Sequence, residues 1–200
     1  MKSLSPEELS IGNFIATKTF VRGDNPDLGS YLIVARSIVQ SAMASAQENG
    51  ELADDYKEAA RKTSYNIGAE TWPGWVDMAV SGEQLAMGLE SAELTLSLSL
   101  ELNQPPGLLE NAYWILAAHL LAAGDTVKAR SAFEKCQELI IEDRGEPAPP
   151  VEAWALLCDA VGGKAEAIGE FDRLVDRIER DGDPAQKVGY LRKAKDVFLA

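Results

Sequence analysis

The residues that could perform acid–base or nucleophilic chemistry are few and scattered. His119 is the only histidine, and it lies in an apolar helical pattern with alanine and leucine on either side. Acid–base catalysis by histidine needs a neighbouring carboxylate or nucleophile to orient the ring, and the sequence places none beside it. We therefore expect a hydrogen-bonded or partly exposed helix histidine and no catalytic group.

The thiols and carboxylates also lack the spacing of a site. Cys136 and Cys158 form neither a CxxC pair nor a Cys/His cluster, so we expect two buried thiols. Glu83, Glu90 and Glu101 would lie along one line of a helix, but their intervals of 7 and 11 residues separate them by roughly 10 and 16 Å. Those distances are too long for one metal ion or one acid–base pair. With no phosphate loop or nucleophile motif either, the sequence predicts a non-enzymatic protein without cofactor or metal.

The charge of the chain narrows its possible partners. The formal net charge is -13 over 200 residues, which argues against nucleic acid because phosphate binding needs clustered Lys and Arg. Residues 63–127 contain no Lys or Arg, and their carboxylates are those of Glu70, Asp77, Glu83, Glu90, Glu93, Glu101, Glu110 and Asp125. Such a surface would attract basic partners and repel anionic membranes. The alternative is a solvated face that only keeps the protein soluble.

The lengths of the apolar segments predict where in the cell the protein is found. The first ten residues contain no secretory apolar run, and no apolar stretch approaches the 18 residues of a membrane span. We expect a cytoplasmic protein that does not bind membranes.

Sequence signals for helix starts and helix ends occur along the whole chain. Ser5-Pro6-Glu7-Glu8 predicts a helix start, and Trp72-Pro73 predicts a helix end. Residues 1–200 are predicted to be a single all-helical domain. Its expected parts are N-terminal helices in 1–50, an irregular repeat with an insert in 51–105, repeats in 106–141 and 147–180, and a capping helix in 183–200.

One segment supports two structures. The leucines at 94, 96, 98, 100 and 102 alternate with small or polar residues, which is typical of a half-buried strand. Leu85, Leu89, Ala92, Leu96 and Leu100 instead keep a helical spacing, and no second strand is available to pair. We favour a helix with apolar residues on two sides.

An Ala-x3-Leu/Phe pair recurs along the chain as Ala92/Leu96, Ala129/Phe133 and Ala167/Phe171, offset by 37 and then 38 residues. A period of that length indicates stacked helical units, because one unit cannot bury its apolar face alone. The middle unit reads Tyr113-x2-Leu116-Ala117-x2-Leu120, then Gly124, then Ala129-x3-Phe133, and the third unit aligns with it around Trp154.

These motifs resemble the tetratricopeptide repeat, over residues 61–180. The first unit departs from the pattern, since about twelve extra residues around 72–82 separate its helices. The resemblance implies an all-α fold, a right-handed solenoid of stacked antiparallel helical hairpins with about 7–9 helices.

The resemblance also implies a groove for a partner protein or peptide. The positions that correspond to groove residues are Tyr65, Trp72, Asn111, Trp114, Glu152 and Asp159. That surface would be aromatic and acidic, so we expect a basic partner or one with apolar anchors, and no clamp for a terminal carboxylate.

The sequence also permits three alternatives to a partner-binding groove. The tryptophans could be packing residues between units. A strip of Met87, Leu94 and Leu98 could pair with a second copy in a self-assembling subunit or homodimer. Least favoured is an all-helical enzyme or small-ligand carrier that uses residues 72–82 as a lid.

Overall fold

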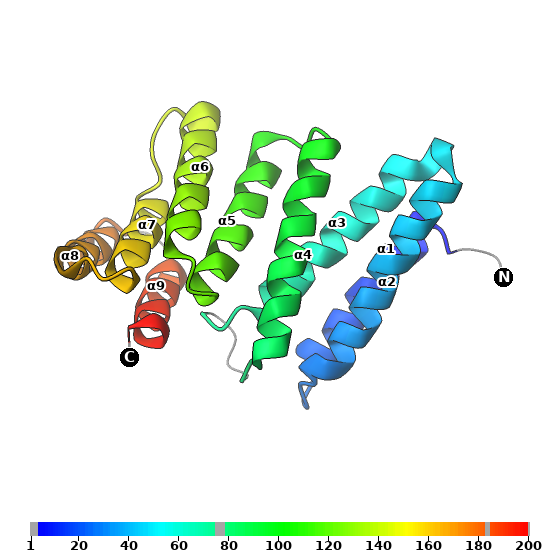
Figure 1. Cartoon of the computed structure of the whole chain (residues 1–200), viewed down its shortest axis with the longest axis horizontal. Helices are drawn as coiled ribbons and strands as arrows, with labels where there is room; N and C mark the ends of the chain where they lie inside the picture. Colours follow the sequence, from blue (N-terminus) through cyan, green and yellow to red (C-terminus); the bar gives the residue numbers. More distant parts are fainter. Residues whose placement is uncertain (1–3, 75–78, 183–184, 200) are drawn as a thin grey trace.

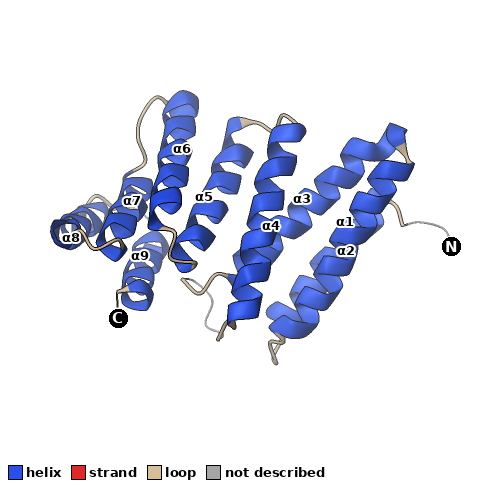
Figure 2. Cartoon of the chain, viewed as in Figure 1, coloured by secondary structure: helices blue, strands red, loops and turns tan. Residues whose placement is uncertain are grey.

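The computed structural model describes residues 4–74, 79–182 and 185–199, and over these residues the chain folds as α-helices without a strand (Figure 2). The all-α prediction is confirmed. The helices are α1 Pro6–Ala16, α2 Leu28–Glu48, α3 Ala53–Thr71, α4 Gly82–Glu101, α5 Pro106–Ala122, α6 Thr126–Arg144, α7 Pro149–Val161, α8 Ala165–Arg180 and α9 Ala185–Phe198. A π-helical turn, Thr17–Val21, continues α1, and a 3₁₀ turn, Gly50–Leu52, precedes α3.

Side-chain capping boxes fix the starts of α1 and α4. Ser5 begins α1 with a capping box, in which its hydroxyl accepts from the Glu8 amide at 3.2 Å and the Glu8 carboxylate accepts from the Ser5 amide at 2.7 Å. Ser81 and Gln84 make the same pair of bonds at the start of α4. Each box satisfies amides that a helix leaves without an intrahelical partner.

The segment with two possible structures is helical. Residues 94–101 belong to α4, whose buried residues include Ala92, Thr95, Leu98 and Ser99 at helical spacing. Packing against α3 and α5 covers both sides of this helix. The strip proposed for self-assembly is used within the chain, because Leu98 is buried and Met87 and Leu94 pack against the core.

Successive helices lie side by side from α2 to α8 (Figure 1). The most extensive contacts join neighbours in the chain, above all α5 with α6, α2 with α3 and α3 with α4, and α9 returns to pack on α7 and α8. The three repeated alanines, Ala92, Ala129 and Ala167, are all buried at these contacts. A small residue there lets two helix backbones approach closely.

The core is divided along this row of helices. Residues of α1 to α4 form two smaller apolar clusters, and residues of α5 to α9 form most of the largest cluster. Trp72, which follows α3, crosses this division, since it belongs to the largest cluster. Its position ties the N-terminal helices to the C-terminal ones.

The last helix covers the C-terminal end of the core. Val188, Leu191 and Ala194 are buried against the preceding helices. On the polar side, Lys195 pairs with Asp172 at 2.6 Å and Arg192 with Glu179 at 2.7 Å. Among the described residues, no helix has the length and apolar character that crossing a membrane requires.

Candidate functional site

Three tryptophans from successive parts of the chain meet between α3, α5 and α7. The ring centroids of Trp72 and Trp114 are 5.6 Å apart, those of Trp72 and Trp154 are 5.4 Å apart, and those of Trp114 and Trp154 are 5.6 Å apart. All three pairs are edge-on, with interplanar angles of 73° to 84°, a geometry that aromatic quadrupoles favour. Phe133 stacks on Trp154 from α6. We call these residues the tryptophan cluster.

Trp72 forms the base of this cluster and has no exposed surface. Its indole Nε1–H donates to the Ala118 carbonyl oxygen at 2.8 Å, which satisfies its one polar group. The predicted groove contact at Trp72 is thus a packing residue in this structure. The physical reason is that Trp114, Trp154 and Phe198 surround it, and these lie far away in the sequence.

A cleft of about 260 Å³ lies over the tryptophan cluster. We call it the aromatic cleft. Three of the six predicted residues line it together, namely Tyr65 from α3 and Asn111 and Trp114 from α5. Its other lining residues are Glu110, Arg144, Ala148, Pro150, Val151, Trp154, Lys187 and Tyr190. The cleft therefore combines three aromatic side chains besides Trp154 with a few polar groups, which is the usual composition of a binding site.

The charges at the rim of the aromatic cleft are mixed. The Arg144 guanidinium pairs with the Glu110 carboxylate at 2.7 Å. Burial raises the pKa of Glu110, against the opposing effect of Arg144. Lys187 lies at the same cleft and adds a second positive charge. The cleft is consequently aromatic, with charges of both signs at its rim.

A second cleft of about 370 Å³ adjoins the first and shares Tyr65 and Asn111 with it. It is lined mainly by α1, α3 and α5, and it contains the carboxamides of Asn13 and Asn66. The Arg61 guanidinium at this cleft is held by the Glu58 carboxylate through bonds of 2.7 and 2.8 Å. Because they share these two residues, the two clefts are adjacent, and the residues that line them come from helices between α1 and α9.

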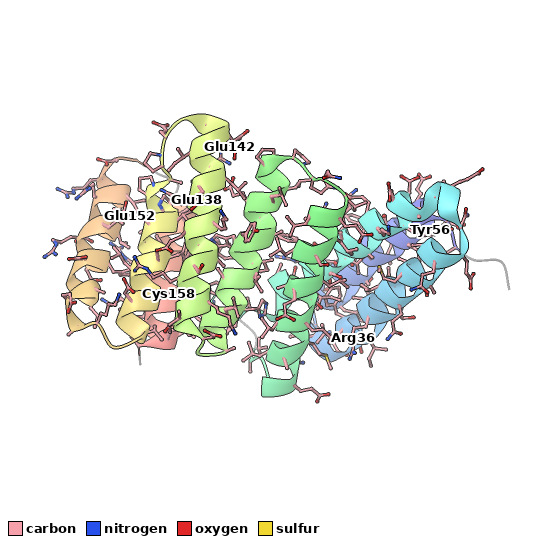
Figure 3. All side chains as sticks on the ribbon, turned by 45° about the horizontal axis from the view of Figure 1, so that its top comes forward. Arg36, Tyr56, Glu138, Glu142, Glu152 and Cys158 are labelled. Carbon is pink, nitrogen blue, oxygen red and sulfur yellow. The ribbon has the colours of Figure 1, made fainter. Side chains whose placement is uncertain are left out.

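The other two predicted residues lie away from both clefts. Glu152 faces α8, where it lines a separate depression with Leu174 and Arg177 (Figure 3). Asp159 is paired with Arg130 and Lys164 near the end of α7. On α7 the aromatic cleft is lined by Val151 and Trp154 instead. A helix turns by about 100° per residue, so a register one residue different places Glu152 on another face.

The stretch without positive charge is partly neutralised by the fold. Four of its carboxylates pair with cations from outside residues 63–127, in Arg22–Glu70 at 2.6 Å, Lys57–Glu101 at 2.8 Å, Arg144–Glu110 at 2.7 Å and Lys128–Asp125 at 2.9 Å. Asp77 lies outside the described residues. Glu83, Glu90 and Glu93 are exposed on α4. Within the described part of residues 63–127, the remaining exposed carboxylates therefore lie on α4.

His119 occupies the junction of α3, α4 and α5. It is buried, its Nε2 lies 2.8 Å from the Gly68 carbonyl oxygen, and its Nδ1 has no hydrogen-bond partner. Burial lowers its pKa to about 4. It lines neither the aromatic cleft, nor the cleft that adjoins it, nor the depression at Glu152. His119 therefore packs in the core. Its Nε2 has the hydrogen-bond partner that we expected, whereas its Nδ1 has none.

The thiols and carboxylates assemble no site in the part of the chain that the structure describes. Cys136 and Cys158 are both buried and free, as predicted. No cluster of three histidine, cysteine or acidic residues there could hold a metal ion. A cleft of about 450 Å³ between α2 and α4 contains none of the six predicted groove residues, but Glu83 and Met87 line it. Arg36 lies on the α2 side of this cleft (Figure 3).

Sequence reasoning missed several residues of the aromatic cleft. Trp154 carries a sequence signal, because it stands in the third repeat motif, but the groove positions of the tetratricopeptide repeat correspond to Glu152 and Asp159 on that helix. Arg144, Lys187 and Tyr190 carried none, since they come from the end of α6 and from α9 and reach the cleft only through the tertiary packing.

Comparison with known proteins identifies no relative of this chain. No protein-family model, curated protein or solved structure matches it.

Proposed function

We propose that this chain is a non-enzymatic interaction module, built as a tetratricopeptide-like right-handed solenoid, that binds an extended segment of a partner protein in the aromatic cleft. The observation that carries the proposal is that Tyr65, Asn111 and Trp114, which come from two different helices, line one cleft. Groove lining by successive helices is how helical repeats hold extended peptides.

The chemistry of the cleft suits an apolar anchor side chain. Trp114, Tyr65 and Tyr190 offer aromatic contact surface, and such anchors dominate the energy of many interfaces. The exposed Asn111 carboxamide supplies both a donor and an acceptor for a peptide backbone. Because Trp114 rests against the buried Trp72, its ring is held in place before a ligand arrives, which lowers the entropy cost of binding.

The charges of the protein suggest the composition of the partner. At the aromatic cleft, Arg144 and Lys187 lie beside Glu110, so the cleft favours neither a positively nor a negatively charged ligand. The exposed carboxylates on α4, those of Glu83, Glu90 and Glu93, would attract basic residues. We propose a cytoplasmic protein partner with an apolar anchor and basic residues. Nucleic acid and membrane surfaces are not proposed as partners.

Peptide selection tests the proposal. A displayed library of random peptides is selected on the immobilised protein, and the enriched sequences are compared with those from the Asn111→Arg variant. Asn111 is exposed, so the substitution fills the cleft with a bulky cation without disturbing the core. We expect peptides with a large aromatic or aliphatic residue to be enriched on the unmodified protein and lost on the variant.

A matched control separates this effect from the added charge. Gln47→Arg places the same side chain at an exposed position on α2, away from the cleft. The control should retain the enriched peptides. Equal enrichment on the protein and on Asn111→Arg would remove the aromatic cleft as the binding site.

A further inference from the structure

Helix α1 presents an apolar stripe to solvent. Ile11 is 51%, Phe14 is 62% and Ile15 is 56% exposed. The opposite side of the helix is buried through Leu9, Asn13 and Ala16. Several large apolar side chains exposed together on one helix face mark an interaction surface, whereas single exposed residues need no explanation.

A charge of opposite sign stands at each end of this stripe. Glu7 and Lys18 are both exposed, and neither has an ion-pair partner among the described residues. The Lys18 Nζ lies 5.7 Å from the centroid of the Phe14 ring, which places Lys18 on the same face. The stripe then runs through residues 7, 11, 14 and 18, whose spacing of four, three and four is that of a helix-pairing seam.

The spacing of this stripe is the same from either end, and reversing its direction sets Glu7 opposite Lys18 and Ile11 opposite Phe14. We propose that the stripe binds a second copy of this chain, with the two α1 helices antiparallel about a two-fold axis. Glu7 then faces Lys18 of the partner subunit, and Ile11 faces Phe14 of the partner subunit. Each contact occurs twice, as a two-fold interface requires.

The charges select the antiparallel arrangement. A parallel pair would place each Glu7 against its own equivalent and each Lys18 likewise, and like charges repel. The antiparallel pair instead makes two attractive contacts and buries the apolar residues between them. An unrelated partner would need no such symmetry in the stripe.

The stripe is short, so the dimer should be weak. It spans about three helical turns, and small interfaces belong to transient complexes. Association should therefore be sought by sedimentation equilibrium over a concentration series that reaches about 1 mM. We expect a monomer–dimer equilibrium for the unmodified protein.

Charge reversal tests the pairing itself. Glu7→Lys alone and Lys18→Glu alone should each weaken dimerisation by about tenfold, because each turns two attractive contacts into repulsive ones. The double variant should dimerise like the unmodified protein. An equimolar mixture of the two single variants should form a heterodimer of restored affinity.

Two further measurements complete the test. Phe14→Glu should abolish dimerisation while leaving the circular dichroism spectrum and thermal midpoint close to those of the unmodified protein, since Phe14 is exposed. Asn111→Arg in the aromatic cleft should leave dimerisation unchanged. A monomer throughout the series, a dimer that Phe14→Glu leaves intact, or single charge reversals without effect would each overturn the proposal.

Discussion

The indole rings of Trp72 and Trp114 meet edge-on, with centroids 5.6 Å apart and planes at 76°. Trp72 has no exposed surface, whereas Trp114 lines the aromatic cleft. The floor of the cleft is thus part of the core, and the residue that orients Trp114 cannot itself touch a ligand.

Replacing Trp72 should destabilise the protein strongly. Trp72→Phe loses the hydrogen bond to the Ala118 carbonyl oxygen and leaves a cavity, so we expect a loss of about 2 kcal/mol in the free energy of unfolding. Urea denaturation measures it. Val127→Ala, at a side chain that is 79% exposed, is the control and should change stability by less than about 0.5 kcal/mol.

Gly88 should not tolerate a side chain. A Cβ atom there would overlap the His119 ring and the Thr71 hydroxyl, so Gly88→Ala should cost about 3 kcal/mol or more through overpacking. Gly189→Ala in α9 is the matched control, because a Cβ at that position meets nothing within 4 Å. The control should be neutral or stabilising by about 0.5–1 kcal/mol. Similar stabilities for the two variants would contradict the close packing at His119.

The stability of the protein should fall with acidification through His119. Its pKa is lowered to about 4 by burial, whereas an unfolded chain has a histidine pKa of about 6.5. Between these values the unfolded state binds more protons, so the free energy of unfolding decreases as the pH falls from 6.5 toward 4.

That linkage has a measurable size. Between pH 7 and pH 5, the free energy of unfolding should fall by about 2 kcal/mol because of His119. The pH dependence of urea unfolding is compared for the unmodified protein and His119→Gln, which keeps a donor for the Gly68 carbonyl but does not titrate. Carboxylate titrations are common to both proteins, so the difference isolates His119. Parallel pH profiles would show that His119 is already solvated in the folded state.

The two thiols should be unreactive in the native protein. Burial raises the pKa of both Cys136 and Cys158 to about 12, so the thiolate population near pH 8 is very small. A chromogenic disulfide reagent should label neither within minutes under native conditions and both in denaturant. Fast labelling of one thiol before unfolding would mean that its helix opens locally.

Helix positions could be predicted well because their signals are local. The Ser5 cap and the Trp72-Pro73 stop act within one turn, and both operate where expected. The segment 94–101 was ambiguous from its own pattern and became helical because α3 and α5 pack on both sides of it.

The candidate site could be predicted only in part. Tyr65, Asn111 and Trp114 come together because α3 and α5 lie on the same side of the row of helices and turn these residues toward one cleft. Glu152 lies outside the aromatic cleft, whereas its neighbour Val151 lines it, because one residue along a helix changes the face by about 100°. The burial of Trp72 depends on Phe198, whose ring centroid is 6.1 Å away and which lies at the other end of the chain. No local pattern contains that contact.

One measurement tests the central claim most directly. The indole N–H signals of the protein are followed by nuclear magnetic resonance during titration with a peptide enriched in the selection described above. We predict that the signal of Trp114, assigned by Trp114→Phe, shifts saturably, and that Asn111→Arg abolishes the shift while Gln47→Arg retains it. A bound peptide that leaves the Trp114 signal in place would contradict the assignment of the aromatic cleft as the binding site.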